Sequence, residues 1–199
     1  MNVQIWIDGG ALSAFGGAFI GGVFVIIGGW LVHHWQQKAR KEKERETFRN
    51  VLKAFKQELA TLWENYENII GSEIESIKEG EYLDRQYVMT QEYFTVYKNN
   101  IPMLSRLDNE GLQELIVRTY LSACHLMDAI KANNDALEKL MKYFVFNIHH
   151  PSPYYSDFIE LIRNGLIEDA KDLKNRHEIV KDLIKRVLLQ LEQTIQSLK

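Results

Sequence analysis

The chain has 199 residues, a formal net charge of −3 and a single cysteine. This length allows one domain with a sizeable core, the weak acidity gives no support for nucleic-acid binding, and one cysteine excludes an intramolecular disulfide framework. Only three prolines occur, and eight of the twelve glycines lie between Gly9 and Gly29. Because sheets need more frequent turn residues than the remainder contains, the sequence predicts an all-α protein.

The first predicted element is an uncharged helix. The 24 residues from Gly9 to Val32 carry no charged side chain, and about 20 helical residues are enough to cross a hydrocarbon core of ~30 Å. A cleaved signal peptide is the main alternative. Such a peptide begins with positive charge, whereas the only charged side chain before this run is that of Asp8. We therefore expect residues 1–37 to form a short tail and a retained transmembrane helix.

The residues that flank this run predict its orientation. Lysines and arginines follow the run within a few turns, in a basic juxtamembrane segment at residues 38–47, and none precedes it. The positive-inside rule then places the N-terminus outside and the C-terminal part in the cytoplasm, at an inner membrane if the protein is bacterial. The expected membrane-interface anchors are Trp6, Trp30, Trp35, Lys38, Arg40 and Lys41.

The glycines of the predicted span recur at helical spacing. Four-residue steps align small residues on two adjacent ridges, which together form a face that is almost free of side chains. Such a face lets helix backbones approach closely within a bilayer, so it predicts self-association or packing on a different membrane protein. The predicted packing face consists of Gly9, Gly10, Ser13, Ala14, Gly17, Ala18, Gly21, Gly22 and Gly29.

Residues 48–199 are predicted to form a cytoplasmic helical bundle. An apolar stripe continues the first helix, which we expect to run from about Ala11 to Lys78 with a weak point at Gly71. Residues 81–107 read as a connector with one short helix, capped by Thr90 and ending at Lys98. Two further long helices follow. Their predicted starts are caps at Asp108 and Ser156, and their predicted ends lie near Asn147 and Leu198.

Three long helices joined by reversals predict an antiparallel bundle with a short extra helix. In that topology the second long helix returns toward the membrane, so we expect the turn Tyr143–Tyr155 near the cytoplasmic leaflet. The last helix carries apolar residues at alternating three- and four-residue steps, as in a coiled-coil seam. His177 interrupts this seam, and we interpret it as a core residue with satisfied hydrogen bonds or one that sets the register.

The sequence contains no motif that indicates a catalytic, cofactor or metal site. It lacks a Gly-x-x-x-x-Gly-Lys phosphate loop, a Gly-x-Ser-x-Gly elbow and the Glu-x-x-His motif of diiron bundles. Carboxylates are plentiful but lie among lysines, as on a solvated surface. We therefore expect a non-enzymatic protein without cofactor or metal, and an enzyme with an unrecognised site remains the weaker alternative.

The layout resembles that of small bacterial proteins with one N-terminal span and a helical cytoplasmic domain, some of which are membrane effectors of anti-phage defence systems. The resemblance implies clustering in the inner membrane and disruption of that membrane, for example by a pore. The leading hypothesis is a non-enzymatic membrane protein that oligomerises through its glycine face and uses the bundle for regulation or protein binding. The alternative is an anchored adaptor or accessory subunit that recruits a soluble partner or joins a larger membrane complex.

Overall fold

The computed structural model describes residues 9–88 and 93–198, and the side chains of these residues from Gly28 onward. Within this described part, all regular secondary structure is helical and no strand occurs. The all-α prediction is therefore confirmed. Contacts divide the chain into two units, one ending at Phe48 and the other spanning Arg49–Lys199.

The first unit contains the beginning of helix α1 (Gly9–Tyr66). Every side chain described from Gly28 to Thr47 is exposed. Among the described residues, no helix offers a stretch long and apolar enough for a membrane crossing. The side chains of the predicted span up to Ile27 lie outside the described residues, so the transmembrane helix stays a prediction.

The second unit contains the rest of α1, a π-helical turn η1 (Glu67–Gly71), and helix α2 (Ser72–Ser76). Helix α3 (Thr95–Leu104), helix α4 (Glu110–His149) and helix α5 (Pro153–Ser197) follow. The expected long first helix is thus helical to Ser76, and the expected weak point Gly71 ends its π turn. The prediction of a helical bundle is confirmed, and within the described residues its three long helices are accompanied by two short ones, α2 and α3.

The predicted boundaries of α3 and of the last helix are wrong. The short helix begins at Thr95 and includes Pro102, because the carboxylate of Glu58 caps its first turn from a different helix. The expected cap Thr90 lies outside the described residues. Helix α5 begins at Pro153, since proline has a fixed φ suited to a first helical turn, and Ser156 already lies within the helix.

The cap of helix α4 lies one residue later than predicted. Asn109, not Asp108, is the residue before the helix, and its Oδ1 accepts a hydrogen bond from the backbone N of Leu112 at 3.0 Å. Asparagine at this position satisfies one of the N–H groups that a helix start leaves unpaired.

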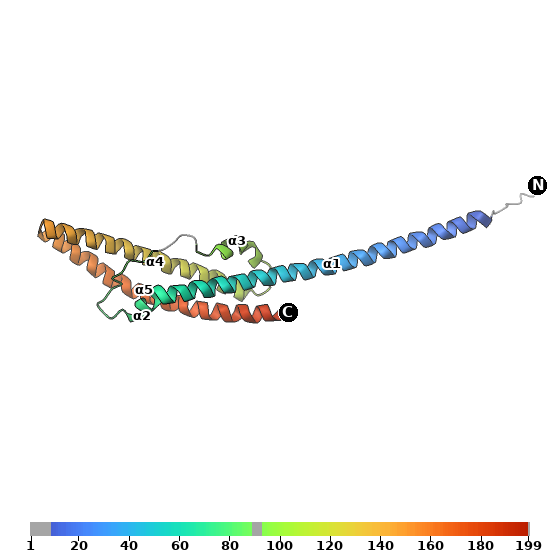
Figure 1. Cartoon of the computed structure of the whole chain (residues 1–199). Coiled ribbons are helices and arrows are strands. Elements are labelled where there is room, and N and C mark those ends of the chain that lie inside the picture. Colours follow the sequence, from blue (N-terminus) through green and yellow to red (C-terminus); the bar gives the residue numbers. More distant parts are fainter. Residues whose placement is uncertain (1–8, 89–92, 199) are drawn as a thin grey trace, which may run out of the picture. The chain divides into compact units, whose positions relative to one another are not determined.

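Helices α1 and α4 run parallel, which corrects the predicted all-antiparallel bundle. Near the start of the bundle, the ring of Phe55 contacts that of Tyr120. Further along, Glu73 and Asn134 both bind Tyr87. Later residues of α1 and α2 therefore lie beside later residues of α4, so these helices point in the same direction. Helix α5 points in the opposite direction (Figure 1).

The reason for the parallel arrangement is the segment between α2 and α4, which returns along the bundle before α4 begins. The turn between α4 and α5 then lies at the end of the bundle opposite α3 and the C-terminus (Figure 1). Helix α4 therefore does not return toward the end where α1 enters the bundle, which corrects the prediction on which the placement of the Tyr143–Tyr155 turn near the cytoplasmic leaflet depended.

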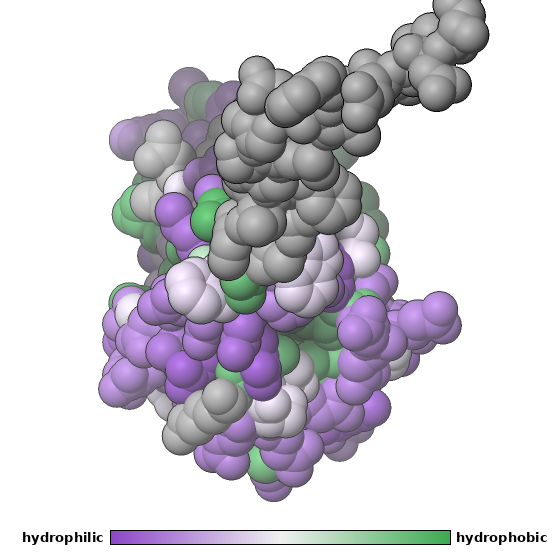
Figure 2. Space-filling view, turned by 90° about the vertical axis from the view of Figure 1, so that its right-hand side faces the viewer, coloured by the Kyte–Doolittle hydropathy of each residue, from purple (hydrophilic) through white to green (hydrophobic). Residues whose placement is uncertain are grey.

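The core follows the predicted seam of α5. Its positions at three- and four-residue steps from Leu166 to Ile195 are buried, His177 among them. Ile159 and Ile162, at the start of the predicted seam, are only half-buried, because there α5 packs on α4 in a two-helix hairpin. Figure 2 shows one face of the molecule, where hydrophilic side chains predominate and hydrophobic ones form small separate patches.

Candidate functional site

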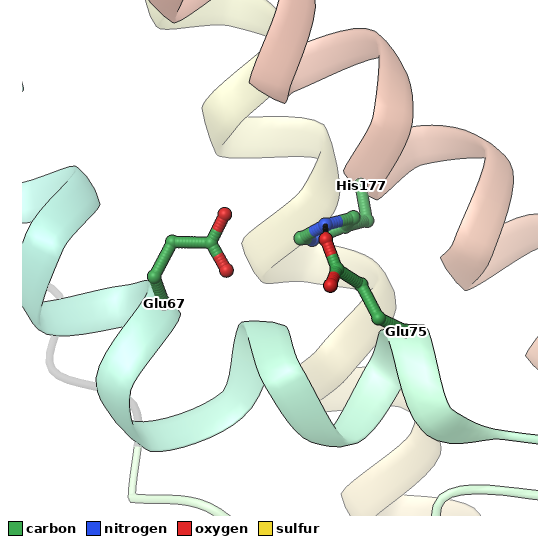
Figure 3. Close-up of side chains that lie close together, drawn as sticks. All are labelled: Glu67, Glu75 and His177. Carbon is green, nitrogen blue, oxygen red and sulfur yellow. Dashed lines mark hydrogen bonds and ion pairs between the residues drawn. The ribbon is translucent and has the colours of Figure 1, made fainter.

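A cluster of polar side chains surrounds His177 in the second unit. Helix α5 places His177 in its apolar seam, where the side chain is 1% exposed. Its Nδ1 lies 2.9 Å from the Tyr66 hydroxyl, and its Nε2 lies 3.0 Å from Glu75 Oε1. Both ring nitrogens therefore have partners, which agrees with the interpretation of His177 as a satisfied core residue. Figure 3 shows His177 beside Glu75.

Glu75 links the buried imidazole to the surface. The ammonium of Lys181 donates to the same oxygen, Oε1, that faces His177. Hydrogen bonds from Lys181 and then from His177 lower the pKa of Glu75, and the bond with Glu75 raises the pKa of Lys181. Because Glu75 and Lys181 are both exposed, solvent screens this ion pair and its contribution to stability is small.

Aromatic rings cover the other side of His177. The ring centroids of Trp63 and Tyr66 each lie 5.7 Å from that of the imidazole. Burial raises the pKa of Tyr66 above its ordinary value, and the nearby carboxylates of Glu67 and Glu75 raise it further. The hydroxyl therefore stays protonated, and a protonated hydroxyl can both donate and accept a hydrogen bond.

Glu67 completes the cluster from the π turn. One carboxylate oxygen of Glu67, one of Glu75 and one ring nitrogen of His177 all lie within 4.8 Å of one another. The Glu67 carboxylate points across the gap toward the other two side chains (Figure 3). It also lies against Gly71, where a Cβ would come 2.2 Å from Glu67 Oε2.

Lys174 holds the backbone beneath this cluster. Its ammonium donates to the carbonyl oxygens of Glu75 at 3.1 Å and of Ile77 at 2.6 Å. The last carbonyls of a helix have no partner within the helix, so this lysine caps α2 from α5. Together with the side-chain contacts of His177 and Lys181, it fixes α2 on α5.

Two asparagines of α4 anchor the segment that follows α2. Asn133 is 1% exposed and donates from Nδ2 to the carbonyl of Leu83 at 3.1 Å. Asn134 accepts from the backbone N of Tyr87 at 3.1 Å and donates to its carbonyl at 2.7 Å. The path of this segment along the bundle is thus held by specific hydrogen bonds.

An apolar cavity of about 460 Å³ lies next to the cluster, among α1, the connector, α4 and α5. Trp63 and Tyr66, which contact His177, are part of its wall. The remaining wall residues are Leu59, Leu62, Asn65, Ile69, Ile70, Tyr87, Val88, Tyr93, Phe94, Ala123, Met127, Val180 and Ile184.

The site residues expected from the sequence lie elsewhere in the chain. Gly29 and the anchors Trp30, Trp35, Lys38, Arg40 and Lys41 are exposed on α1. The ring of Trp30 stacks on that of His34, with centroids 5.8 Å apart. Trp6 lies outside the described residues. The same holds for the side chains of the packing face from Gly9 to Gly22, although these residues are helical.

Sequence reasoning singled out His177 but missed its partners. Glu75 has the pattern of an ordinary surface carboxylate among lysines. Eight residues along a regular α-helix also leave its side chain about 80° from that of Glu67, so the sequence does not pair the two. The sequence indicates the cluster only through the histidine in the α5 seam.

No family model matches the chain, and no curated protein or solved structure matches it.

Proposed function

We propose that the chain is a non-enzymatic membrane protein that self-associates through its glycine-rich face and uses the helical bundle to bind a partner protein. The observation that carries the proposal is the uncharged run Gly9–Val32, which contains Trp30 near its end and is followed by Trp35 and by basic residues. The run is long enough to span a bilayer, and its flanks favour an N-terminus outside and a cytoplasmic bundle. The compartment proposed is a bacterial inner membrane.

The described end of this run supports membrane contact. Trp30 is 66% exposed and Trp35 is 68% exposed. Large aromatic rings are unfavourable in water but favourable at the level of lipid headgroups, where the ring is in an apolar layer and the indole N–H meets polar groups. The exposed Lys38, Arg40 and Lys41 that follow suit an anionic leaflet.

The proposed self-association depends on the small residues of the run. At Gly29, the one member of the packing face with a described environment, a Cβ would meet no atom within 4 Å. A bilayer provides no hydrophobic drive between helices, so association requires close backbone approach, and small residues permit it.

The test replaces Gly17 and Gly21 together by leucine and compares crosslinked species in native membranes. The matched control, Val23→Leu with Ile26→Leu, changes residues on the side of the helix opposite Gly17 and Gly21. We expect oligomers in the wild type and the control, and monomers in the double glycine variant. Unchanged oligomers in the glycine variant would rule out this face. Release of the protein from membranes by alkaline carbonate would rule out the span itself.

One form of this function is a leak in the inner membrane, as the resemblance to anti-phage effectors implies. It predicts that expression of the wild type lowers the membrane potential and that the double glycine variant does not. If the membrane potential is fully maintained at high expression of the wild type, the leak is ruled out and clustering alone remains.

An anchored adaptor is the second candidate, favoured by apolar residues exposed at the end of the α4–α5 hairpin. Met141 is 64% exposed, Phe144 54% and Ile148 61%. Large apolar side chains gathered on one surface favour protein contact. A photo-crosslinking residue at Phe144 of the full chain, with Glu160 as the control position, should yield one dominant heterologous product in cells. Equal products at both positions would contradict the adaptor.

A further inference from the structure

We propose that Glu67, Glu75 and His177 form a binding site for a divalent transition-metal ion, with Zn²⁺ as the best fit. This goes beyond the sequence, which indicated no metal site, and it is independent of the proposed membrane function. Borderline ions such as Zn²⁺ accept imidazole nitrogen and carboxylate oxygen together, whereas Mg²⁺ and Ca²⁺ prefer oxygen ligands alone. The three side chains come from η1, α2 and α5, so an ion here would join three elements.

The distances between the donor atoms allow one ion to contact all three side chains. Two donor atoms bound to one Zn²⁺ at about 2.0–2.2 Å are separated by roughly 3–3.5 Å. His177 Nε2 and Glu75 Oε1 are 3.0 Å apart, and one carboxylate oxygen of Glu67, one of Glu75 and one ring nitrogen of His177 all lie within 4.8 Å of one another. A rotation of the flexible Glu67 side chain therefore completes a three-ligand site, with the fourth position left for water (Figure 3).

The π turn brings the two carboxylates to the same side. In an uninterrupted α-helix, Glu67 and Glu75 would be offset by about 80° around the axis. The wider turn at Glu67–Gly71 removes most of this offset. Gly71 then leaves space for the Glu67 carboxylate, because any side chain at this position would begin 2.2 Å from Glu67 Oε2. Single π turns of this kind are frequent at functional sites.

Tyr66 is the hydrogen-bond partner of the His177 ring nitrogen that would not bind the ion. A metal-bound imidazole commonly donates its other ring N–H to a neighbouring acceptor, which fixes the tautomer. The Tyr66 hydroxyl lies 2.9 Å from His177 Nδ1 and can accept from it. In the absence of an ion, the same hydroxyl can donate to Nδ1 while Nε2–H donates to Glu75. A rotation of the hydroxyl therefore accompanies the change of tautomer.

Lys181 competes with the ion. Its ammonium binds Glu75 Oε1, the oxygen nearest to His177 Nε2. An ion at this place must displace the ammonium or bind beside it against charge repulsion. Removal of the lysine charge should therefore tighten metal binding, an effect that a chance surface site would not show.

The experiment titrates the full chain in detergent with Zn²⁺ alone, after chelator treatment, by calorimetry, and repeats it with Co²⁺ to read the ligand field from its visible spectrum. We expect Glu67→Gln to weaken Zn²⁺ binding by about tenfold or more and Lys181→Met to strengthen it several-fold. The matched controls Glu64→Gln and Lys185→Met, both at exposed positions, should leave the affinity unchanged. Mg²⁺ and Ca²⁺ should compete weakly.

Two results would overturn the site. If Zn²⁺ binds equally to the wild type and to Glu67→Gln, the ion is adventitious and held by other histidines. If no Zn²⁺ binds in the micromolar range to either the wild type or Lys181→Met, the cluster is a structural network only. Circular dichroism of each metal-free variant tests whether the fold is intact. If it is, a lost affinity is due to the changed ligand and not to unfolding.

Discussion

The hydroxyl of Tyr120 on α4 donates a hydrogen bond of 2.9 Å to Oε2 of Glu58 on α1. The same carboxylate accepts from the backbone N of Val96 at 2.7 Å and from that of Tyr97 at 3.1 Å. Phe94, the residue before α3, has a φ of 67° and gives no side-chain cap. Glu58 therefore caps α3 from another helix and joins it to α4.

Replacement of Glu58 by alanine should destabilise the protein by about 2–4 kcal/mol, because two backbone donors and one hydroxyl lose their acceptor. Glu58→Gln keeps one acceptor oxygen and should cost less. Denaturant unfolding measures both, with exposed Glu64→Ala as the control. Hydrogen exchange should rise first in α3, and uniform exchange across the bundle would contradict the cap.

Tyr120 should make stability depend on pH above about 10. Burial, with the charge of Glu58, raises the pKa of Tyr120 in the folded state above its ordinary value. The unfolded chain then releases the phenol proton at lower pH than the folded chain does. This contribution is fully present below the unfolded pKa and is lost as the pH rises above it.

Tyr120→Phe isolates this effect, because it keeps the ring stacked on Tyr97 at 3.9 Å and removes only the hydroxyl. We expect the variant to be less stable at pH 7 and to lose less stability than the wild type between pH 9 and 11. The measurement is the denaturant midpoint at each pH. If the denaturant midpoints of both proteins change in parallel with pH, Tyr120 does not titrate differently in the folded and unfolded states.

Asn134 should control the path of the connector. Its side chain binds both backbone groups of Tyr87, so Asn134→Ala leaves one donor and one acceptor without their partner, at a cost of about 1–3 kcal/mol. Limited proteolysis should cut the variant faster between α2 and α3. Exposed Lys131→Ala on the same helix is the control, and equal cleavage of the two variants would contradict this role.

The sequence predicts the seam of α5 well, because the buried positions of this helix recur every three to four residues from Leu166 to Ile195. It does not predict the direction of α4. The 18 residues between α2 and α3, 77–94, can span up to about 60 Å when extended. A segment of this length allows α4 to run either parallel or antiparallel to α1. The choice depends on contacts such as Asn133 with Leu83 and Asn134 with Tyr87, which are far apart in the sequence.

The cluster at His177 escaped prediction for a similar reason. Its donors are separated by more than 100 residues between α2 and α5, and the alignment of Glu67 with Glu75 depends on one π turn that hydrophobic periodicity does not reveal. A histidine in an apolar seam was the only visible sign. Its partners could be identified only after the helices were placed side by side.

Gly71→Ala should change the stability of the protein little and lower its metal affinity. The added methyl group would lie 2.2 Å from Glu67 Oε2 and 3.0 Å from Glu67 Cδ, so the end of the Glu67 side chain must move away. This side chain is flexible and half-buried, and alanine is a better helix former than glycine by about 1 kcal/mol. The free energy of unfolding should therefore stay within about 1 kcal/mol of the wild type.

Zn²⁺ affinity should nevertheless fall several-fold in Gly71→Ala, because the displaced carboxylate no longer faces His177 and Glu75. Calorimetric titration and denaturant unfolding of the same preparation measure the two quantities. Gly165→Ala, at an exposed position on α5 where a Cβ meets no atom within 4 Å, is the matched control and should keep the wild-type affinity. Wild-type Zn²⁺ affinity in Gly71→Ala would show that Glu67 does not need this space to reach the ion.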